Sequence, residues 1–199
     1  MKRLRVLTGD DDPMVTEGLR AMLERLGHGV AGAAHDGMGA VARAESMNPD
    51  LILLDIKMPR LDGVEAARQI MAHRPVPIIL VTAHSDPDLI ERAMAAGVMG
   101  YLMKPVEIKA LEAAIALALS RFTDLASLQK DVQGLKETLV FRQQVERAKG
   151  VLAYRLRMSE AAAHEKLQHF ARTERCTLAE AASRVIAGDK LFAELEKLP

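Results

Sequence analysis

This 199-residue chain has a single cysteine, no tryptophan and no long apolar run. Cys176 is its only cysteine, so the chain holds no internal disulfide and no cysteine-cage zinc site, and it suits a reducing compartment. No apolar stretch approaches the ~20 residues that cross a bilayer. The apolar run behind the basic N-terminal residues is too short for a signal peptide. These absences predict a cytoplasmic protein that does not enter a membrane.

The chain also has no formal net charge and few aromatic residues. The chain has 27 Lys and Arg against 27 Asp and Glu, which gives a formal net charge of zero. No global field therefore attracts nucleic acid, and any basic surface must be local. Aromatic residues make up 3% of the chain and apolar residues 49%, so a sizeable core must be mainly aliphatic. The length allows one large domain or two small ones.

Strand-like and helix-like segments alternate along residues 1–120. The strand candidates are short runs rich in Val, Ile and Leu, which is typical of parallel strands buried on both faces. They cover residues 4–8, 29–33, 51–54, 77–82 and 99–103. Helical patterns lie between them near 13–26, 37–46, 63–73 and 87–96, and another begins near 107. Five strand–helix repeats predict an α/β fold with a doubly wound, five-stranded parallel sheet.

Charged side chains stand where three of these strands end. The run Asp10-Asp11-Asp12 follows the first apolar stretch, Asp55 follows the third, and Lys104 follows the fifth. Because the carboxyl ends of parallel strands converge on one crevice, we expect these groups within a few ångströms of one another. Asp12 directly precedes a proline and is expected to cap the first helix. Asp10 and Asp11 are then left for the crevice.

This crevice has the groups of a phosphoryl-accepting pocket. Crowded carboxylates repel one another, so the pocket needs a cation. Mg²⁺ suits such ligands, since it binds one or two carboxylates together with waters and phosphate oxygens. Asp55 is then placed to attack phosphorus and form an aspartyl phosphate. Lys104 offers a positive charge to the phosphoryl oxygens, and Thr82, which ends another apolar run, offers a hydroxyl.

Residues 1–120 resemble the receiver domain of bacterial response regulators, which has a flavodoxin-like fold. The resemblance is carried by the stretches VLTGDDDP, LILLDIKMPRLDG, ILVTAHSD and AGVMGYLMKP. It implies that Asp55 accepts a phosphoryl group from a histidine kinase. It also implies that Mg²⁺ is held by Asp10, Asp11, Asp55 and the backbone carbonyl of Lys57.

The same resemblance assigns the groups that bind the phosphoryl group and respond to it. Thr82 and Lys104 would bind its oxygens, and Tyr101 is the aromatic residue that reorients on activation. Pro105 matches the family's cis-proline after the lysine. The chain departs from the family at residues 8–9, where Thr and Gly replace bulkier apolar residues. This departure removes no chemical group from the pocket.

The helix that begins near residue 107 has no clear stop. Its apolar residues recur at spacings of three and four, at Ile115, Ala118, Phe122, Leu125, Leu128, Val132, Leu135 and Leu139. This is a heptad pattern with one three-residue irregularity. Two interpretations stay open. The segment is either an amphipathic helix packed on its own domain or a coiled-coil-like linker over residues 115–140 that pairs with a second copy.

Residues 138–199 contain no convincing strand. Helices are predicted at about 138–157, 160–175 and 178–187, with a short one near 190–198. Ser159 is expected to cap the second helix, and Thr177 with Glu180 forms a capping box for the third. The pattern predicts a small all-α domain of three helices.

Five basic residues gather on the first of these helices, against the single acid Glu146. They are Arg142, Arg147, Lys149, Arg155 and Arg157. They form either an ordinary solvated face or, in a chain without net charge, a local patch for nucleic acid. Gly150 lies in the helix interior, where glycine costs about 1 kcal/mol relative to alanine. That cost indicates a close approach at Gly150, by another helix or by a phosphate backbone.

The stretch FRQQVERAKGVLAYRLRMSEAAAHEKLQHFA resembles the ANTAR domain, an RNA-binding module of bacterial transcription antiterminators. The segment ERAKGVL matches most closely. The resemblance implies that a homodimer binds RNA stem-loops in a leader transcript and prevents a terminator hairpin. The basic residues, Gly150 and His164 are then the candidate RNA contacts. His164 stands where the family more often has Phe or Tyr.

The sequence therefore predicts a response regulator of a two-component system, in which phosphorylation controls dimerisation and RNA binding. Two alternatives stay open: a DNA-binding response regulator, and a receiver whose output is a protein interaction. Against the first, no sharp helix–turn–helix is evident, and the basic residues lie on the first helix rather than on a late recognition helix. Residues 138–199 hold no Asp, His, Cys or Ser cluster with catalytic spacing, so no enzymatic output is predicted.

Overall fold

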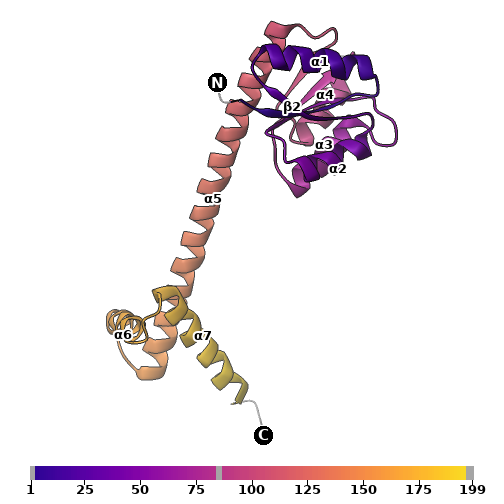
Figure 1. The fold of residues 1–199 in the computed structure, drawn as a ribbon. Helices are drawn as coiled ribbons and strands as arrows, with labels where there is room; N and C mark the ends of the chain where they lie inside the picture. The colour runs from indigo at the N-terminus through magenta and orange to yellow at the C-terminus, as the bar shows by residue number, and fades with distance from the viewer. Residues whose placement is uncertain (1–2, 84–86, 196–199) are drawn as a thin grey trace. The chain divides into compact units, whose positions relative to one another are not determined.

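The computed structural model describes residues 3–83 and 87–195, which form five strands and seven helices (Figure 1). The strands are β1 (Arg5–Gly9), β2 (Gly29–Ala34), β3 (Leu51–Asp55), β4 (Ile78–Thr82) and β5 (Gly100–Met103). The helices are α1 (Pro13–Arg25), α2 (Gly37–Met47), α3 (Gly63–His73), α4 (Pro87–Ala95), α5 (Ile108–Leu156), α6 (Glu160–Thr173) and α7 (Leu178–Leu195). The strand–helix alternation predicted for residues 1–120 is confirmed, with element ends shifted by a residue or so.

The five strands pair in parallel in the order β2-β1-β3-β4-β5. The chain passes from β1 to β2 on one side and then returns to place β3 on the other side of β1. This is the flavodoxin-like order, in which ligands bind beyond the carboxyl ends of the strands that flank the reversal. Asp10 directly follows β1 and Asp55 ends β3, so both lie at the reversal.

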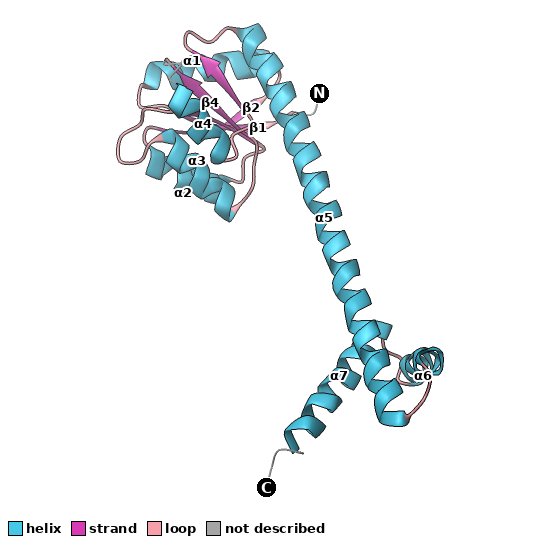
Figure 2. Ribbon diagram, turned by 180° about the vertical axis from the view of Figure 1, so that it is seen from behind, coloured by secondary structure: helices cyan, strands magenta, loops and turns pink. Residues whose placement is uncertain are grey.

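Alternate side chains of β1, β3 and β4 enter two separate cores. Ile52 and Leu54 of β3 pack with α2, α3 and α4, whereas Leu51 and Leu53 pack with α1 and α5. All four side chains are fully buried, and each contributes roughly 1.5–3 kcal/mol of transfer free energy. Helices thus cover both faces of the sheet (Figures 1 and 2), which confirms the predicted doubly wound architecture.

Local signals explain where several helices begin and end. The Asp12 side chain accepts a hydrogen bond of 2.8 Å from the Met14 N–H and caps α1, as predicted. Gly27 and Gly97 have φ values of 82° and 80°, the left-handed conformation that ends helices and that glycine adopts without strain. The predicted Asp86 cap lies outside the described residues.

The chain divides into two compact units, residues 1–127 and 128–199, and α5 contributes to both. All the strands belong to the first unit (Figure 2). In that unit, Ile115 and Ala118 are buried against the sheet, so this part of α5 packs on its own domain. Further along α5, four residues of the heptad pattern, which we call the seam, are 50–65% exposed within the described chain. They are Leu128, Val132, Leu135 and Leu139.

The second unit packs α6 and α7 with the last turns of α5 around a small core. Its buried members are Val145, Ala148, Leu167, Ala171, Ala181 and Ala182. Two predicted caps are confirmed. The Ser159 hydroxyl accepts from the Ala162 N–H at 3.3 Å, and Thr177 and Glu180 exchange hydrogen bonds of 2.8 and 3.2 Å. The predicted three-helix domain is therefore present.

One prediction for this unit is wrong. A stop near residue 187 and a separate short helix near 190–198 were expected, but α7 is continuous from Leu178 to Leu195. Gly188 lies within it and costs only about 1 kcal/mol relative to alanine. Next to it, Asp189 forms an ion pair of 3.0 Å with Arg155 of α5, a tertiary contact that supports the helix at this point. In the described ranges, none of the helices is long and apolar enough to span a membrane.

Candidate phosphoryl-acceptor site and nucleic-acid interface

Three predicted residues meet at the carboxyl ends of β1, β3 and β5. Lys104 Nζ lies 2.7 Å from Asp10 Oδ2 and 2.9 Å from Asp55 Oδ1. The backbone fixes the lysine there, because its N–H donates to the Thr82 carbonyl at 2.8 Å and ties the end of β5 to the end of β4. Groups far apart in the sequence therefore form one cluster, as the strand-end positions predicted.

The cluster is buried and carries excess negative charge. The side chains of Asp10, Asp55 and Lys104 are 1%, 7% and 23% exposed. Burial raises the pKa of Asp55, and the hydrogen bond from Lys104 opposes that rise. Burial lowers the pKa of Lys104, but the hydrogen bonds to both carboxylates outweigh it and leave that pKa raised. Two carboxylates and one ammonium leave a net negative pocket, which favours a further cation.

The predicted metal ligands are only partly gathered. Asp11 is exposed and lines an open groove of about 510 Å³ together with Lys57. Across residues 3–83 and 87–195, no three Asp, Glu, His or Cys side chains come close enough to hold a metal ion by themselves. Mg²⁺ needs only one or two protein carboxylates, since waters and phosphate oxygens complete its octahedron. Asp10, Asp11, Asp55 and the Lys57 carbonyl are thus ligand types that fit Mg²⁺.

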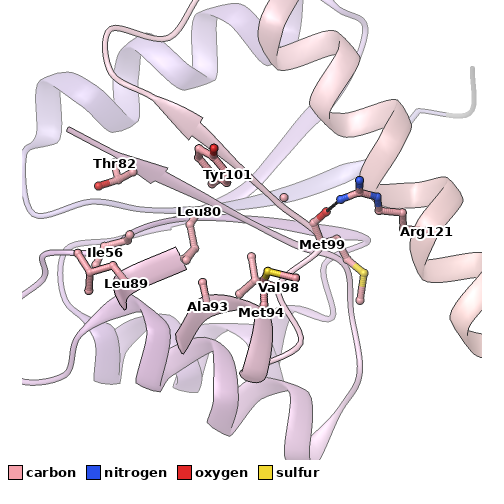
Figure 3. Close-up of a pocket in the computed structure, with 11 residues that line it drawn as sticks. Ile56, Leu80, Thr82, Leu89, Ala93, Met94, Val98, Met99, Tyr101 and Arg121 are labelled. Atoms are coloured by element: carbon pink, nitrogen blue, oxygen red, sulfur yellow. Dashed lines mark hydrogen bonds between the residues drawn. The ribbon is translucent and has the colours of Figure 1, made fainter. Parts of the chain in front are cut away.

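A cavity of about 220 Å³ lies beside Thr82 (Figure 3). Thr82 and Tyr101, the two predicted switch residues, both line it, but Thr82 is 4% exposed and Tyr101 is 50% exposed. Most of the other lining groups are aliphatic and come from β3–α3, β4, α4 and β5, including Ile56, Leu80, Leu89, Ala93 and Val98. At one end, Arg121 Nη1 donates to the Met99 carbonyl at 3.1 Å. The cavity therefore offers empty space next to the half-exposed ring of Tyr101.

Two glycines packed against β3 leave no room for a side chain, and neither was predicted as a site residue. A Cβ on Gly63 would collide with the Asp55 carbonyl oxygen, and a Cβ on Gly9 would lie 2.6 Å from Leu54 Cδ2. The stretch Leu-Asp-Gly at residues 61–63, where α3 begins, is the signal that could have identified Gly63. The peptide bond before Pro105 is cis, as the resemblance implied.

The five predicted basic residues of the C-terminal unit fall into two groups. Lys149 lies 2.8 Å from Glu146, and Arg155 lies 3.0 Å from Asp189. These two cations are neutralised inside the unit. Within the described part of the chain, three are exposed and have no ion pair, namely Arg142, Arg147 and Arg157.

Arg147 also borders a groove of about 440 Å³ between α5 and α7. The polar groups that line it with Arg147 are Gln143, Gln144, Ser183 and Lys190. Guanidinium, ammonium, amide and hydroxyl groups are the donors that bind phosphates and base edges in nucleic-acid complexes. This groove is therefore a candidate nucleic-acid interface.

Gly150 and His164 occupy different environments. A Cβ on Gly150 would meet no atom within 4 Å, so helix packing inside this unit is not the reason for a glycine there. His164 is half-buried, and its Nε2 lies 2.9 Å from Gln168 Nε2. The assignment of His164 to RNA stays a prediction.

Comparisons with known proteins give each unit a family. Residues 6–116 match the response regulator receiver domain, and residues 133–186 match the ANTAR domain. The transcriptional regulatory protein PdtaR of Mycobacterium tuberculosis is 43% identical over 182 residues, which cover 92% of this chain and 89% of PdtaR. The similarity to PdtaR therefore extends across both units.

Solved structures share the fold of the first unit. A receiver domain of a modulated diguanylate cyclase from Desulfovibrio desulfuricans is 35% identical, with a TM-score of 0.58, and covers 61% of this chain and 98% of its own. The receiver domain of NarL from Mycobacterium tuberculosis is 31% identical, with a TM-score of 0.56, and covers 59% and 98%.

Proposed function

This chain belongs to the response regulators that join a receiver domain to an ANTAR domain, and we propose that phosphorylation of Asp55 controls its binding to RNA stem-loops. The observation that carries the proposal is the buried cluster of Asp10, Lys104 and Asp55. A costly arrangement of two buried acids and one ammonium is expected where charge must be redistributed during a reaction. The output is antitermination of transcription on a leader transcript in the cytoplasm.

Asp55 is the nucleophile of the proposed transfer. One carboxylate oxygen forms a bond to phosphorus while the nitrogen–phosphorus bond of the kinase phosphohistidine breaks, and the leaving imidazole keeps the electron pair and takes up a proton. Lys104, 2.9 Å from Asp55 Oδ1, is within reach of the incoming phosphoryl oxygens. Its ammonium charge offsets the charge that gathers on those oxygens in the transition state.

Mg²⁺ is proposed as the cofactor, held by Asp10, Asp11, Asp55 and the Lys57 carbonyl. When bound, it would supply positive charge to the transferring phosphoryl group. Asp10 has a second task, because its oxygen 2.7 Å from Lys104 Nζ orients the ammonium. Burial of Asp10 and Asp55 keeps bulk water from the acceptor side of the pocket.

Thr82 and Tyr101 are proposed to transmit the change. A phosphoryl group on Asp55 attracts the Thr82 hydroxyl, and the Tyr101 ring then moves inward into the cavity of about 220 Å³ that both residues line (Figure 3). Phosphorylation would shift an existing equilibrium between the outward and inward arrangements rather than create a new fold. The affected surface comprises α4, β5 and the start of α5.

A phosphorylation-dependent homodimer is proposed to link the two units. The exposed seam on α5, from Leu128 to Leu139, has the spacing by which two helices pair. Pairing would hold two ANTAR domains together, and the second stem-loop would then bind at a high effective concentration. A histidine kinase is the proposed donor of the phosphoryl group.

The test is binding of the full chain to an RNA with two tandem stem-loops, with and without a small phosphodonor and Mg²⁺. The phosphodonor should tighten RNA binding by the wild type. It should leave RNA binding by Asp55→Asn unchanged, because the amide is not a nucleophile and cannot form an aspartyl phosphate. The same assay uses a DNA duplex of equivalent sequence. Preferential DNA binding would support the DNA-binding alternative, and an absence of salt-dependent binding to either would support a protein-interaction output.

A further inference from the structure

One face of the last turns of α5 is open to solvent. It presents Gln143, Arg147, Gly150 and Tyr154, spaced by four, three and four residues, and all four are exposed. We refer to these four residues as the Tyr154 face. Tyr154 is 81% exposed, the largest value among the exposed large hydrophobic and aromatic side chains of the described chain. The opposite side of the same helix supplies the core residues Val145 and Ala148.

Gly150 lies about one helical turn before Tyr154 on the same face of α5 and leaves bare backbone there, which we call the gap at Gly150. Helical side chains lean toward the N-terminus over the preceding turn, so Gly150, four residues before Tyr154, is the position that the ring approaches. Yet a Cβ on Gly150 would find no atom within 4 Å, so the ring does not close over it. A flat group laid against the ring therefore meets bare backbone rather than a side chain. The glycine costs helix stability without any packing inside the unit that requires it.

The charges around the Tyr154 face favour an anionic partner. Two nearby acids are already neutralised, since Glu146 pairs with Lys149 and Asp189 pairs with Arg155. Arg147 has no ion pair among the described residues and is exposed. Arg147 lies seven residues, about two helical turns, before Tyr154 on the same face. Exposed aromatic rings and unneutralised cations on one surface are the combination by which proteins hold single-stranded nucleic acid, through base stacking and phosphate contacts.

We propose that the Tyr154 face binds one unpaired base of the RNA loop. The base stacks on the Tyr154 ring over the gap at Gly150, and Arg147 binds an adjacent phosphate. This inference rests on the proposed RNA-binding function. A loop base is the expected occupant because the deep, narrow major groove of an RNA duplex is closed to side chains, whereas loop bases can be splayed out and stacked.

The first experiment separates stacking from charge. The probe is a stem-loop RNA selected for wild-type binding from a pool with a randomised loop, and the full chain is used throughout. Tyr154→Ala should weaken binding by about 5- to 150-fold, whereas Tyr154→Phe should bind within about twofold of the wild type. Tyr154→Ala should leave the log–log salt slope unchanged. Arg147→Ala should lower that slope by about 0.7–0.9, because it removes a phosphate contact.

The second experiment reports on the ring directly. The chain contains no tryptophan, so Tyr154→Trp introduces a unique fluorophore at the proposed stacking position. This variant should keep its RNA affinity, and its emission should be quenched when the loop base stacks on the indole. Retained RNA binding with unchanged emission would place the ring away from the bases and overturn the inference.

The third experiment tests the gap with a matched control on the same helix. Gly150→Ala and Gly134→Ala each replace an α5 glycine whose Cβ would meet nothing within 4 Å, so both should stabilise the helix to a similar extent. Only Gly150→Ala should weaken RNA binding, by about fivefold or more, because the added methyl occupies the space that the base needs. Equal affinities of the two variants would show that the gap holds no RNA group.

The outcomes distinguish this inference from the proposed function. If the wild type fails to bind any stem-loop of the pool, the proposed function fails and this inference fails with it. If the wild type binds and Tyr154→Ala binds equally well, only the stacking assignment is wrong. If Tyr154→Ala changes the sedimentation mass of the chain and not its RNA affinity, the Tyr154 face contacts a second copy of the chain instead.

Discussion

Lys104 pairs with both buried carboxylates of the receiver pocket, so its replacement gives a sharp test of the pocket's electrostatics. Lys104→Met keeps the aliphatic stem and removes the ammonium that lies 2.7 Å from Asp10 and 2.9 Å from Asp55. Two buried acids then remain without that partner. Removing one member of a fully buried ion pair typically costs about 3–5 kcal/mol. Because Lys104 is 23% exposed, we expect a smaller loss, about 2–4 kcal/mol of unfolding free energy.

Hydrogen exchange at β3 measures this loss without interference from the C-terminal helices. All five residues of the strand, Leu51–Asp55, are buried, so their amides exchange through opening of the receiver unit. In Mg²⁺-free buffer they should exchange about 30- to 900-fold faster in Lys104→Met than in the wild type. Lys109→Met is the matched control, since this lysine is exposed on the first turn of α5. It should change the unfolding free energy by less than about 0.5 kcal/mol.

Addition of Mg²⁺ completes the test. Binding to the folded state alone stabilises it by about 2.7 kcal/mol at a hundred times Kd. The variant should recover more protection than the wild type gains at the same Mg²⁺ concentration, because its carboxylates lack the ammonium and attract the ion more strongly. Equal exchange of the variant and the wild type without Mg²⁺ would refute the view that Lys104 holds the two acids together.

Three further predictions concern the metal, the seam and the basic residues. Asp11→Ala should raise the Mg²⁺ concentration needed for phosphoryl incorporation and leave the extent at saturation unchanged, since it removes a ligand but not the nucleophile; an unaltered Mg²⁺ dependence would exclude Asp11 from the site. The double change Leu128→Ser and Leu135→Ser should give a monomer by sedimentation with its helix content retained, and an unchanged mass would argue against a paired seam. Arg147→Ala should flatten the salt dependence of RNA binding, whereas Lys149→Ala should leave the slope in place and lower the melting temperature of the C-terminal unit, because Lys149 already pairs with Glu146. The reverse pattern in the two variants would contradict the ion-pair assignment.

Most of the receiver unit could be predicted from local sequence patterns. Parallel strands covered on both faces must be apolar at every position, so β3 and β4 stand out as the runs LILLD and IILVT. The acids and the lysine stood out because they directly follow such runs, and parallel strands bring their carboxyl ends to one edge. Caps such as Asp12 and the Thr177–Glu180 box were predictable for a similar reason, since their hydrogen bonds join residues only two or three positions apart.

Only the tertiary structure decided which of the predicted groups are available. The basic residues of α5 look alike in the sequence, but Arg155 pairs with Asp189, which lies 34 residues away, while Arg147 stays exposed. The same holds for Gly150, whose open surroundings depend on where α6 and α7 pack. Tyr154 is the clearest case, because a tyrosine on a helix can be buried or exposed, and the fold leaves this one 81% exposed. The sequence by itself determined the chemistry of the acceptor pocket because strand ends converge by topology. The side chains left for a partner were decided by the tertiary structure, because burial and ion pairing depend on contacts between distant segments.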